Sequence, residues 1–254
     1  MLLAIDVGNT LTNFGIFQDD ELKGTFKTES ISTKSIDEYD AIIELFFRKM
    51  NLSEQSIDKA IISSVVPSLT RVFVSLSEKL FMVKPIVLGP KLHSGLQLKV
   101  DNPSEVGSDL VSDAIGGISI YGYPLFIADL GTANKYLYID EDGAFAGLSI
   151  APGLAISMDA LVNKTAALPE VSLNVPSHVM GKNTRDCMNS GITYGTAYQV
   201  RGFAENFERE SGKKLKMILT GGNAIYVKDI LNEFVYDETL LLKGLKEIAK
   251  RREK

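Results

Sequence analysis

The hydrophobic and polar positions at the start of the chain predict a β-meander. Residues 2–7 are apolar except for one aspartate, which predicts a buried strand. Residues 12–17 alternate between the two faces of a strand, and residues 22–28 follow an Asp-Asp turn with the same character. Three short strands joined by tight turns are typical of a meander.

Helix and strand signals then alternate up to about residue 90. Ser35 and Glu38 form a capping box ahead of apolar residues at helical spacing, which predicts the start of an amphipathic helix. Strands are predicted at residues 60–65 and 85–88, and a helix is predicted to begin beyond Pro67, between them. This part of the chain is therefore predicted to be mixed α/β.

The second half of the chain repeats the order of the first. An apolar segment, a glycine turn, an alternating segment, an acidic turn and a further apolar segment predict strands at 125–129, 134–139 and 144–150. Later elements are predicted as helices at 154–163, 184–210 and 240–250 and a strand at 215–219. We place the domain boundary near Gly116 and Gly117, which gives an N-terminal domain at 1–118 and a C-terminal domain at 119–254. The final helix is expected either to stay with the second domain or to pack back on the first.

The composition is that of a globular protein. The 254 residues are 45% hydrophobic and 23% charged, with a formal net charge of -5, which argues against a broad nucleic-acid-binding surface because that needs many Lys and Arg. No apolar stretch approaches the roughly 20 residues of a membrane span, so no membrane partner is expected. The single cysteine, Cys187, is typical of a reducing compartment, and the residues after Met1 lack a secretory pattern. We expect a cytoplasmic protein.

Four polar or small residues stand where the first predicted strand ends and a turn begins, namely Asp6, Gly8, Asn9 and Thr10. Glycine lets the backbone approach an anion, and the Asn and Thr side chains can donate hydrogen bonds to it. An aspartate at the same place can hold Mg²⁺ directly or through water. These residues predict a phosphate-binding turn with Asp6 as a metal ligand. The alternative is ordinary hairpin chemistry, because Asp-x-Gly turns are common.

Two further turns of this kind occur in the second half. Asp129, Gly131 and Thr132 follow the matching strand, and Gly221 and Gly222 follow a later one. Two turns facing one cleft would grip the β- and γ-phosphates of a nucleotide from opposite sides, and the third would suit adenosine or the α-phosphate. Three such turns in this order are a stronger signal than any one of them. The glycine patterns of P-loop and Rossmann nucleotide sites do not occur in the sequence.

This duplicated meander with phosphate turns resembles the superfamily of acetate and sugar kinases, heat-shock chaperone ATPases and actin. Within it, the chain is similar from end to end to the type III pantothenate kinases. The segments that carry the resemblance are 6–10, 63–67, 101–103, 105–107, 129–132, 151–154, 181–184 and 220–222. The resemblance implies an α/β fold of two actin-like (ribonuclease H-like) half-domains with a nucleotide cleft between them.

The resemblance also implies an activity. It is the ATP-dependent phosphorylation of pantothenate to 4′-phosphopantothenate, the first step of coenzyme A biosynthesis, with Mg²⁺ and a monovalent cation (K⁺ or NH₄⁺) as cofactors and a homodimer as the assembly. Phosphoryl transfer depends mostly on positioning and charge neutralisation. The glycine turns with their N–H donors and the aspartates named above are consistent with that chemistry.

Carried over residue by residue, the resemblance gives site residues their roles. Asp109 matches the family's catalytic aspartate, which orients or deprotonates the acceptor hydroxyl. Asp129 matches the monovalent-cation ligand at the subunit interface, and Thr184 matches a residue that a neighbouring subunit lends to the pantothenate pocket. The other expected pocket residues are Val100, Gly107, Ser108 and Leu110. The alternative interpretations are a helix-start carboxylate for Asp109 and a helix N-cap for Thr184.

The chain departs from the family pattern mainly in the acceptor pocket. Leu110 stands where the family has arginine, and Val100 stands where it has an aromatic residue. An arginine there would make charge-assisted hydrogen bonds worth about 1.5–3 kcal/mol each. In the second turn, Asn134 and Lys135 replace two threonines. Lys135 is expected either to bring charge near the phosphate or to point away on the opposite face of its strand.

Two other functions stay open on the sequence. A non-catalytic or altered-acceptor relative, similar to the regulatory Bvg accessory factor branch, would keep the fold; Leu110 favours it, whereas the retained Asp6, Asp109 and Asp129 favour catalysis. An ATPase or chaperone-like member of the actin superfamily is disfavoured, because the chain is too short for a separate peptide-binding domain.

Overall fold

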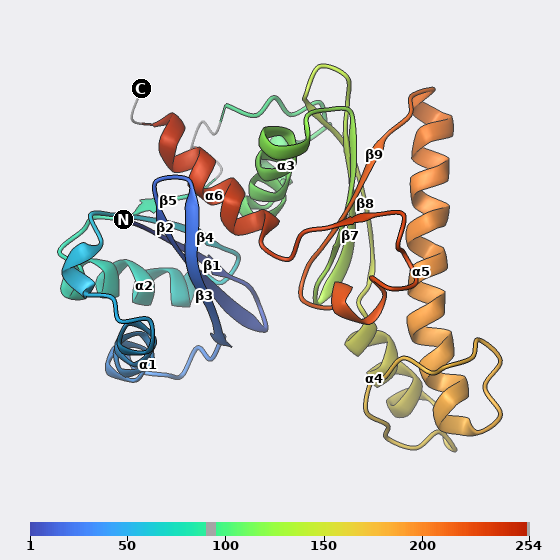
Figure 1. Ribbon diagram of the computed structural model, residues 1–254. Helices are drawn as coiled ribbons and strands as arrows, with labels where there is room; N and C mark the ends of the chain where they lie inside the picture. The colour runs from blue at the N-terminus through green and yellow to red at the C-terminus, as the bar shows by residue number, and fades with distance from the viewer. Residues whose placement is uncertain (90–94, 253–254) are drawn as a thin grey trace. The chain divides into compact units, whose positions relative to one another are not determined.

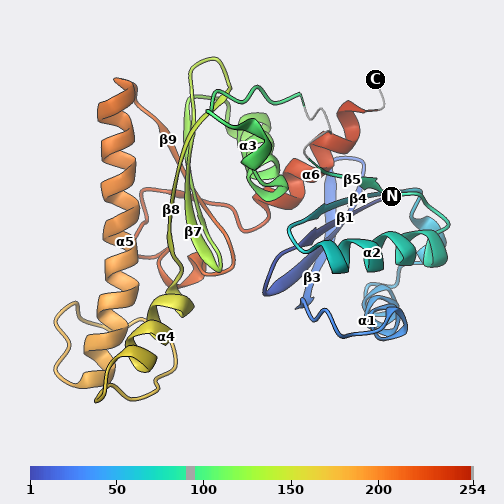
Figure 2. The same ribbon diagram turned by 180° about the vertical axis from the view of Figure 1, so that it is seen from behind.

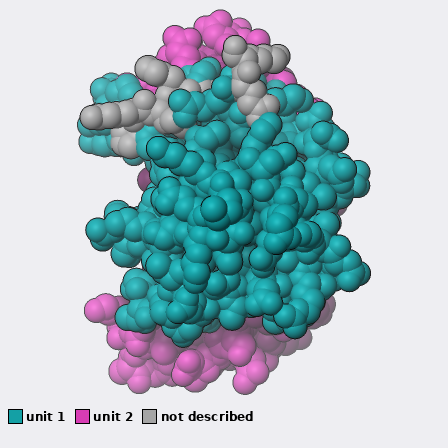
Figure 3. All heavy atoms as spheres, turned by 90° about the vertical axis from the view of Figure 1, so that its left-hand side faces the viewer, with its two compact units in different colours: residues 1–96, 101–119, 240–254 teal, residues 97–100, 120–239 magenta. Residues whose placement is uncertain are grey.

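The structure is a computed structural model that describes residues 1–89 and 95–252. Contacts divide the chain into two compact units, which Figure 3 shows in different colours. Unit 1 comprises Met1–Leu96, Asp101–Ser119 and Leu240–Lys254, and unit 2 comprises Gln97–Val100 and Ile120–Thr239. Each unit contains a five-stranded sheet and a hydrophobic core of its own.

Unit 1 is built on a mixed sheet with the strand order β3-β2-β1-β4-β5. The first three strands form the predicted antiparallel meander, and β4 and β5 extend it in parallel beside β1. The strands are β1 Leu2–Val7, β2 Leu11–Gln18, β3 Glu21–Glu29, β4 Lys59–Ser64 and β5 Ile86–Val87. Each begins and ends within one residue of its predicted range, so the patterning of this part of the sequence is confirmed.

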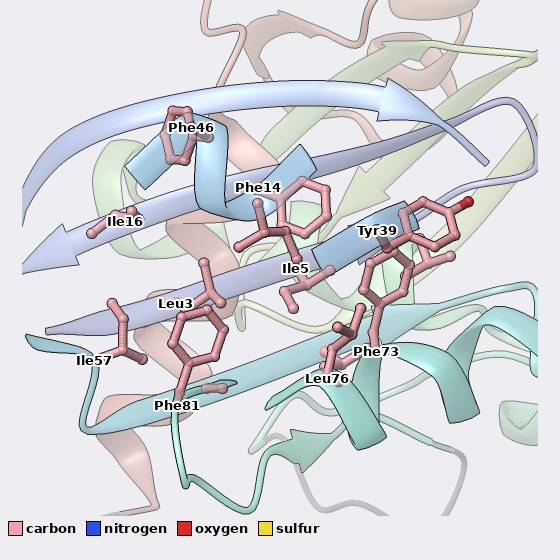
Figure 4. Packing of buried hydrophobic residues seen from close by; sticks show 14 of the residues in the cluster. Leu3, Ile5, Phe14, Ile16, Tyr39, Phe46, Ile57, Phe73, Leu76 and Phe81 are labelled. Carbon is pink, nitrogen blue, oxygen red and sulfur yellow. The ribbon is translucent and has the colours of Figure 1, made fainter. Parts of the chain in front are cut away.

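One face of this sheet is covered by α1 (Ile36–Lys49) and α2 (Pro67–Leu80), as Figures 1 and 4 show. The predicted capping box begins α1, with the Ser35 backbone N–H donating to the Glu38 carboxylate at 2.8 Å. The layer between sheet and helices is filled by fully buried side chains that include Phe14, Tyr39 and Phe73. This burial of apolar surface fixes β1, and with it Asp6, inside the unit.

The opposite face of the sheet carries α3 (Ser108–Tyr121) and α6 (Leu240–Arg251). The two helices cross at glycines: a Cβ on Gly244 would overlap the Ser112 carbonyl oxygen, and a Cβ on Gly116 would overlap that of Leu240. The helix backbones therefore meet without side chains between them. This contact fixes the position of α3, whose first turn carries Asp109.

Gly244→Ala is expected to destabilise the protein by about 1–3 kcal/mol, because the added methyl group must push two helix backbones apart. The measurement is the midpoint of urea unfolding. Gly202→Ala in α5 (Thr184–Ser211) is the matched control: apart from its own helix and chain neighbours, no atom of the described residues lies within 4 Å of where its Cβ would be. Alanine favours helix, so this control should be at least as stable as wild type. A wild-type midpoint for Gly244→Ala would contradict the close helix crossing.

Unit 2 repeats the architecture of unit 1 strand for strand. Its sheet has the order β10-β9-β6-β7-β8, so β6 corresponds to β1, β7 to β2 and β9 to β4. An antiparallel meander is again extended by a parallel strand beside its first member. The strands are β6 Leu125–Leu130, β7 Ala133–Ile139, β8 Phe145–Pro152, β9 Lys216–Thr220 and β10 Val235–Tyr236. The duplication that the sequence predicts is present in the fold.

The long helix α5 runs along one face of this sheet, and α4 (Leu154–Lys164) packs against its N-terminal part, as Figures 1 and 2 show. The core on this face contains Phe126, Ala128, Leu130, Ala197 and Val200. Burial raises the pKa of Tyr136 to about 12. The phenol therefore stays protonated and donates to Gln199 Oε1 at 2.8 Å.

Patterning predicted neither α3 nor the short elements. The short ones are β10 and the 3-10 turns Glu54–Ser56, Pro103–Glu105 and Ala224–Tyr226, which are too short to show a period. The start of α3 had a single signal, the helix-start position of Asp109, because serines and two glycines interrupt its apolar face. None of the described helices is both long enough and apolar enough to cross a bilayer.

Candidate functional site

The first predicted phosphate turn follows directly on a buried carboxylate. Asp6 lies at the carboxyl end of β1, in the middle of the unit 1 sheet, and is 7% exposed. In the next turn the Gly8 N–H donates to the Leu11 carbonyl at 3.0 Å, and a Cβ on Gly8 would lie 2.9 Å from that oxygen. The tight turn therefore requires glycine. Asn9 and Thr10 are exposed at its tip.

The Asp6 carboxylate has polar neighbours on both adjacent strands. Asn13 of β2 donates from Nδ2 to Asp6 Oδ2 at 3.1 Å, and Ser63 of β4 is its register partner on the other side. Among residues 1–89 and 95–252, no group of three or more His, Cys, Asp or Glu is placed to hold a metal ion. Mg²⁺ is commonly held by one or two carboxylates together with water and substrate phosphates. The residues present fit a Mg²⁺ ion that binds with a nucleotide.

Ser63 also links this strand end to the helix that carries Asp109. Its hydroxyl oxygen lies 2.9 Å from that of Ser108, the first residue of α3. Asp109 follows in the first helical turn and is half-buried, and its carboxylate is so close to Gly107 that a Cβ there would overlap Oδ1. Unit 1 thus brings Asp6 close to the segment 107–109, which is far away in the sequence. This position agrees with both interpretations of Asp109, as a base and as a helix-start carboxylate.

Unit 2 joins its predicted glycine turns in one hydrogen-bonded cluster. The Gly131 N–H donates to the Ala133 carbonyl at 3.2 Å, which closes the turn after β6. Asn223 donates from Nδ2 to the Gly131 carbonyl at 2.8 Å, and the Gly153 N–H donates to the Thr132 carbonyl at 3.2 Å. Three loops at strand ends of the same sheet are therefore joined by hydrogen bonds. Thr132 lies in one of these loops and is exposed.

The two glycines after β9 differ in what surrounds them. Gly221 has a φ of 93°, and a Cβ there would overlap Asp129 Oδ1 and lie 2.6 Å from both the nitrogen and the oxygen of Leu130. Glycine alone both adopts this φ readily and leaves the space free. Gly222 is exposed, and apart from its chain neighbours no atom of the described residues lies within 4 Å of where its Cβ would be. The first glycine is needed for packing, whereas the second borders open space.

Asp129 pairs with a cation from the neighbouring strand. Asp129 and Lys135 are register partners on β6 and β7, and Lys135 Nζ lies 2.5 Å from Asp129 Oδ2. The side chains of Lys135 and Asp129 are 18% and 9% exposed. Lys135 therefore points to the same face as Asp129 and brings its charge to the end of β6, which excludes the other orientation that the sequence left open.

The predicted acceptor-pocket residues come from both units. Those in unit 1 are Gly107, Ser108, Asp109 and Leu110. Leu110 is 6% exposed and is therefore a buried apolar side chain. In unit 2, Val100 is half-buried and Thr184 is exposed. Their contacts with an acceptor stay predictions.

Three residues shape the site through contacts that were not predicted: Ser63, Asn183 and Asn223. Asn183 is the N-cap of α5, and its Oδ1 accepts from the Asp186 N–H at 2.9 Å. The alternative interpretation of Thr184 as the cap is therefore wrong, because Thr184 is the first helical residue. Asn followed three residues later by Asp is a capping signal that the sequence contains. The bonds of Ser63 and Asn223 join distant segments and have no local signal.

Solved structures with low sequence identity share this fold. A Campylobacter jejuni protein assigned to the Baf family of transcriptional activators is 18% identical, with a TM-score of 0.62 over 99% of this chain and 98% of its own. The activator of 2-hydroxyisocaproyl-CoA dehydratase from Clostridium difficile, solved with bound ADPNP, is 15% identical, with a TM-score of 0.58 over 99% of this chain and 96% of its own. Component A of (R)-2-hydroxyglutaryl-CoA dehydratase from Acidaminococcus fermentans is 15% identical, with a TM-score of 0.57 over 100% and 99%.

The two mixed sheets of matching strand order and these likenesses define the class of protein by its fold: an α/β protein of two units with the actin-like fold of these solved structures. A sequence profile described as type III pantothenate kinase matches residues 2–206. The chain belongs to the type III pantothenate kinase family. The matched region contains the turns after β1 and β6, Asp109 and Lys135, and it ends before Gly221.

Proposed function

We propose that this chain transfers the γ-phosphoryl group of ATP to the primary hydroxyl of pantothenate, the first step of coenzyme A biosynthesis. The observation that carries the proposal is the chain of contacts in unit 1 from Asp6 through Ser63 and Ser108 to Asp109. It holds the carboxylate that fits Mg²⁺ close to the carboxylate that matches the family's base. Membership of the family supports the choice of reaction.

Asp109 is the proposed catalytic residue. Its carboxylate orients the acceptor hydroxyl and accepts the proton as the oxygen attacks the γ-phosphorus, a role that requires hydrogen-bond reach to that hydroxyl. The segment 107–109 is held by the Ser63–Ser108 bond on one side and by the α3–α6 crossing on the other. The base therefore belongs to a fixed helix rather than to a loose loop.

Phosphate contacts are assigned to the turns after β1 and β6. Gly8, Asn9 and Thr10 in unit 1 and Gly131 and Thr132 in unit 2 offer backbone N–H and side-chain donors. When bound at Asp6, Mg²⁺ would neutralise phosphate charge. The ADPNP complex of the Clostridium difficile activator supports nucleotide binding through likeness of fold.

A homodimer is part of the proposal. Thr184 is exposed at the start of α5, and in the family this position is lent to the acceptor pocket of a neighbouring subunit. A second copy of the chain would thus complete the pantothenate pocket.

The test is to incubate purified protein with ATP and Mg²⁺, with and without pantothenate, and to detect 4′-phosphopantothenate by mass spectrometry. Asp109→Ala protein, prepared in the same way, controls for contaminating kinase. Product that depends on pantothenate and is lost in the variant would support the proposal. Well-folded protein that binds nucleotide but yields no product under varied salt conditions would remove pantothenate as the acceptor.

Leu110 favours a second candidate function, a regulatory or altered-acceptor relative. It is a buried apolar residue at the position where the family has arginine, and it cannot make an ion pair with an acceptor carboxylate. The fold likeness to a protein assigned to the Baf family of transcriptional activators is consistent with this alternative. The same incubation separates the two, because this candidate predicts nucleotide binding without 4′-phosphopantothenate.

A further inference from the structure

Lys135 in unit 2 corresponds to Asn13 in unit 1. Because the two sheets share one strand order, β7 corresponds to β2, and each of these residues is the register partner of the aspartate near the end of the central strand. In unit 1 a neutral amide donates to Asp6 at 3.1 Å, whereas in unit 2 an ammonium group lies 2.5 Å from Asp129. The two equivalent aspartates therefore have different electrostatic surroundings.

The Asp129 carboxylate has a close neighbour at each of its two oxygens. Lys135 Nζ lies against Oδ2, and Gly221 packs so closely against Oδ1 that a Cβ would overlap it. An alkali cation needs several oxygen ligands to replace its hydration shell. With an ammonium group on one oxygen and backbone packed against the other, Asp129 does not fit the K⁺ or NH₄⁺ ion that the family resemblance implies at this position.

We propose that the Lys135 ammonium takes the place of that monovalent cation, so that nucleotide binding by this chain requires neither K⁺ nor NH₄⁺. A lysine ammonium is a compact cation with three N–H donors, and chemically it is a tethered form of NH₄⁺. The pairing of β6 with β7 holds it beside Asp129 and next to the turn that contains Gly131 and Thr132. The charge is thus present at every salt concentration.

The inference rests on the proposed nucleotide binding. It adds that Lys135 supplies the positive charge at the turn after β6. It predicts that Lys135→Thr, which introduces the residue that the family has there, converts the chain to cation dependence. The variant has a buried carboxylate without its ammonium partner and a space beside it. A monovalent ion from solution can then occupy that space.

The experiment compares wild type and Lys135→Thr in KCl and in choline chloride of equal ionic strength. Two quantities are measured: the affinity for a non-hydrolysable ATP analogue with Mg²⁺, by calorimetry, and the Tm without nucleotide. Wild type should have the same affinity and Tm in both salts. Lys135→Thr should bind the analogue at least about tenfold more weakly in choline chloride than in KCl, the loss expected for one charge-assisted contact, and its Tm should be higher in KCl.

Lys213→Thr is the matched control. Lys213 belongs to the same unit and pairs with Glu141 at 3.2 Å, but its side chain is 46% exposed. Losing this surface charge should leave the affinity and the Tm equally insensitive to the choice of salt, as in wild type. A control that itself gains K⁺ dependence would attribute the effect to net charge rather than to Asp129 and would overturn the proposal.

Other results would overturn the proposal, and the Tm comparison tests it even where no nucleotide binds. Wild-type protein whose affinity or Tm rises in KCl overturns the proposal, and this comparison holds even where Lys135→Thr fails to fold. A folded Lys135→Thr variant that ignores K⁺ overturns it as well. If neither protein binds the ATP analogue, the proposed function fails, whereas the Tm comparison, which needs no nucleotide, still tests the role of Lys135.

Discussion

Asp109→Asn is expected to lower kcat for pantothenate phosphorylation by about 10²–10⁴-fold while leaving nucleotide affinity nearly unchanged. Asparagine keeps the size of the side chain and one acceptor oxygen, but it cannot take up the proton of the acceptor hydroxyl. The half-buried side chain lies in the first turn of α3, which the Ser63–Ser108 bond ties to the strand next to Asp6. The measurement is the rate of 4′-phosphopantothenate formation at saturating ATP, with analogue affinity measured in parallel.

The competing interpretation of Asp109 predicts a different result. A helix-start carboxylate stabilises its helix by about 0.3–1 kcal/mol through the helix dipole, so its loss would affect stability and not rate. Asp37→Asn is the matched control, because Asp37 lies in the first turn of α1 and forms an exposed pair with Lys79. It should lose a little stability and keep full activity. An Asp109→Asn variant that behaves in the same way would make Asp109 a structural residue.

The regular elements of both units could be predicted because their signals are local. The buried run of β1, the alternation of β2 and the capping box of α1 each lie within one short window of sequence. The glycine turns after β1 and β6 were predictable for the same reason, since a buried aspartate followed by a glycine turn can be recognised without knowing the rest of the fold; that they bind phosphate stays a prediction. The duplication then placed β6 and β7 in the same relation as β1 and β2.

The contacts that complete the site could not be predicted, because they join segments far apart in the sequence. Ser63 meets Ser108, and Asn223 meets Gly131, across separate loops. The orientation of Lys135 could not be predicted because it depends on the register between β6 and β7. A period of two gives a strand two faces, and a shift of one residue exchanges them. The length of the turn at Gly131 sets the register between β6 and β7 and so places Lys135 beside Asp129. This length cannot be predicted from the pattern of apolar and polar residues.

Among the glycine-to-alanine substitutions in unit 2, Gly221→Ala is expected to be the most destabilising. The substitution adds the strain of an unfavourable φ to a collision with Asp129 and the Leu130 backbone, for a total of about 2–5 kcal/mol. For a chain of 254 residues this corresponds to a fall in Tm of at least about 4 °C. The measurement is Tm and the urea midpoint. A variant as stable as wild type would show that the loop can move away from Asp129 without cost.

Gly222→Ala, one residue further on, tests whether this loop binds the nucleotide without disturbing the packing of the unit. Its φ lies outside the left-handed region and the space around its Cβ is open among the described residues, so stability should stay within about 0.5 kcal/mol of wild type. If a nucleotide lies along this loop, the methyl group occupies space that the ligand needs, and affinity for the ATP analogue should fall about tenfold, equal to about 1.4 kcal/mol. Stable protein with weakened binding places the nucleotide at Gly222. Stable protein with unchanged binding removes this loop from the nucleotide site and leaves Gly131 and Thr132 as the phosphate contacts proposed for unit 2.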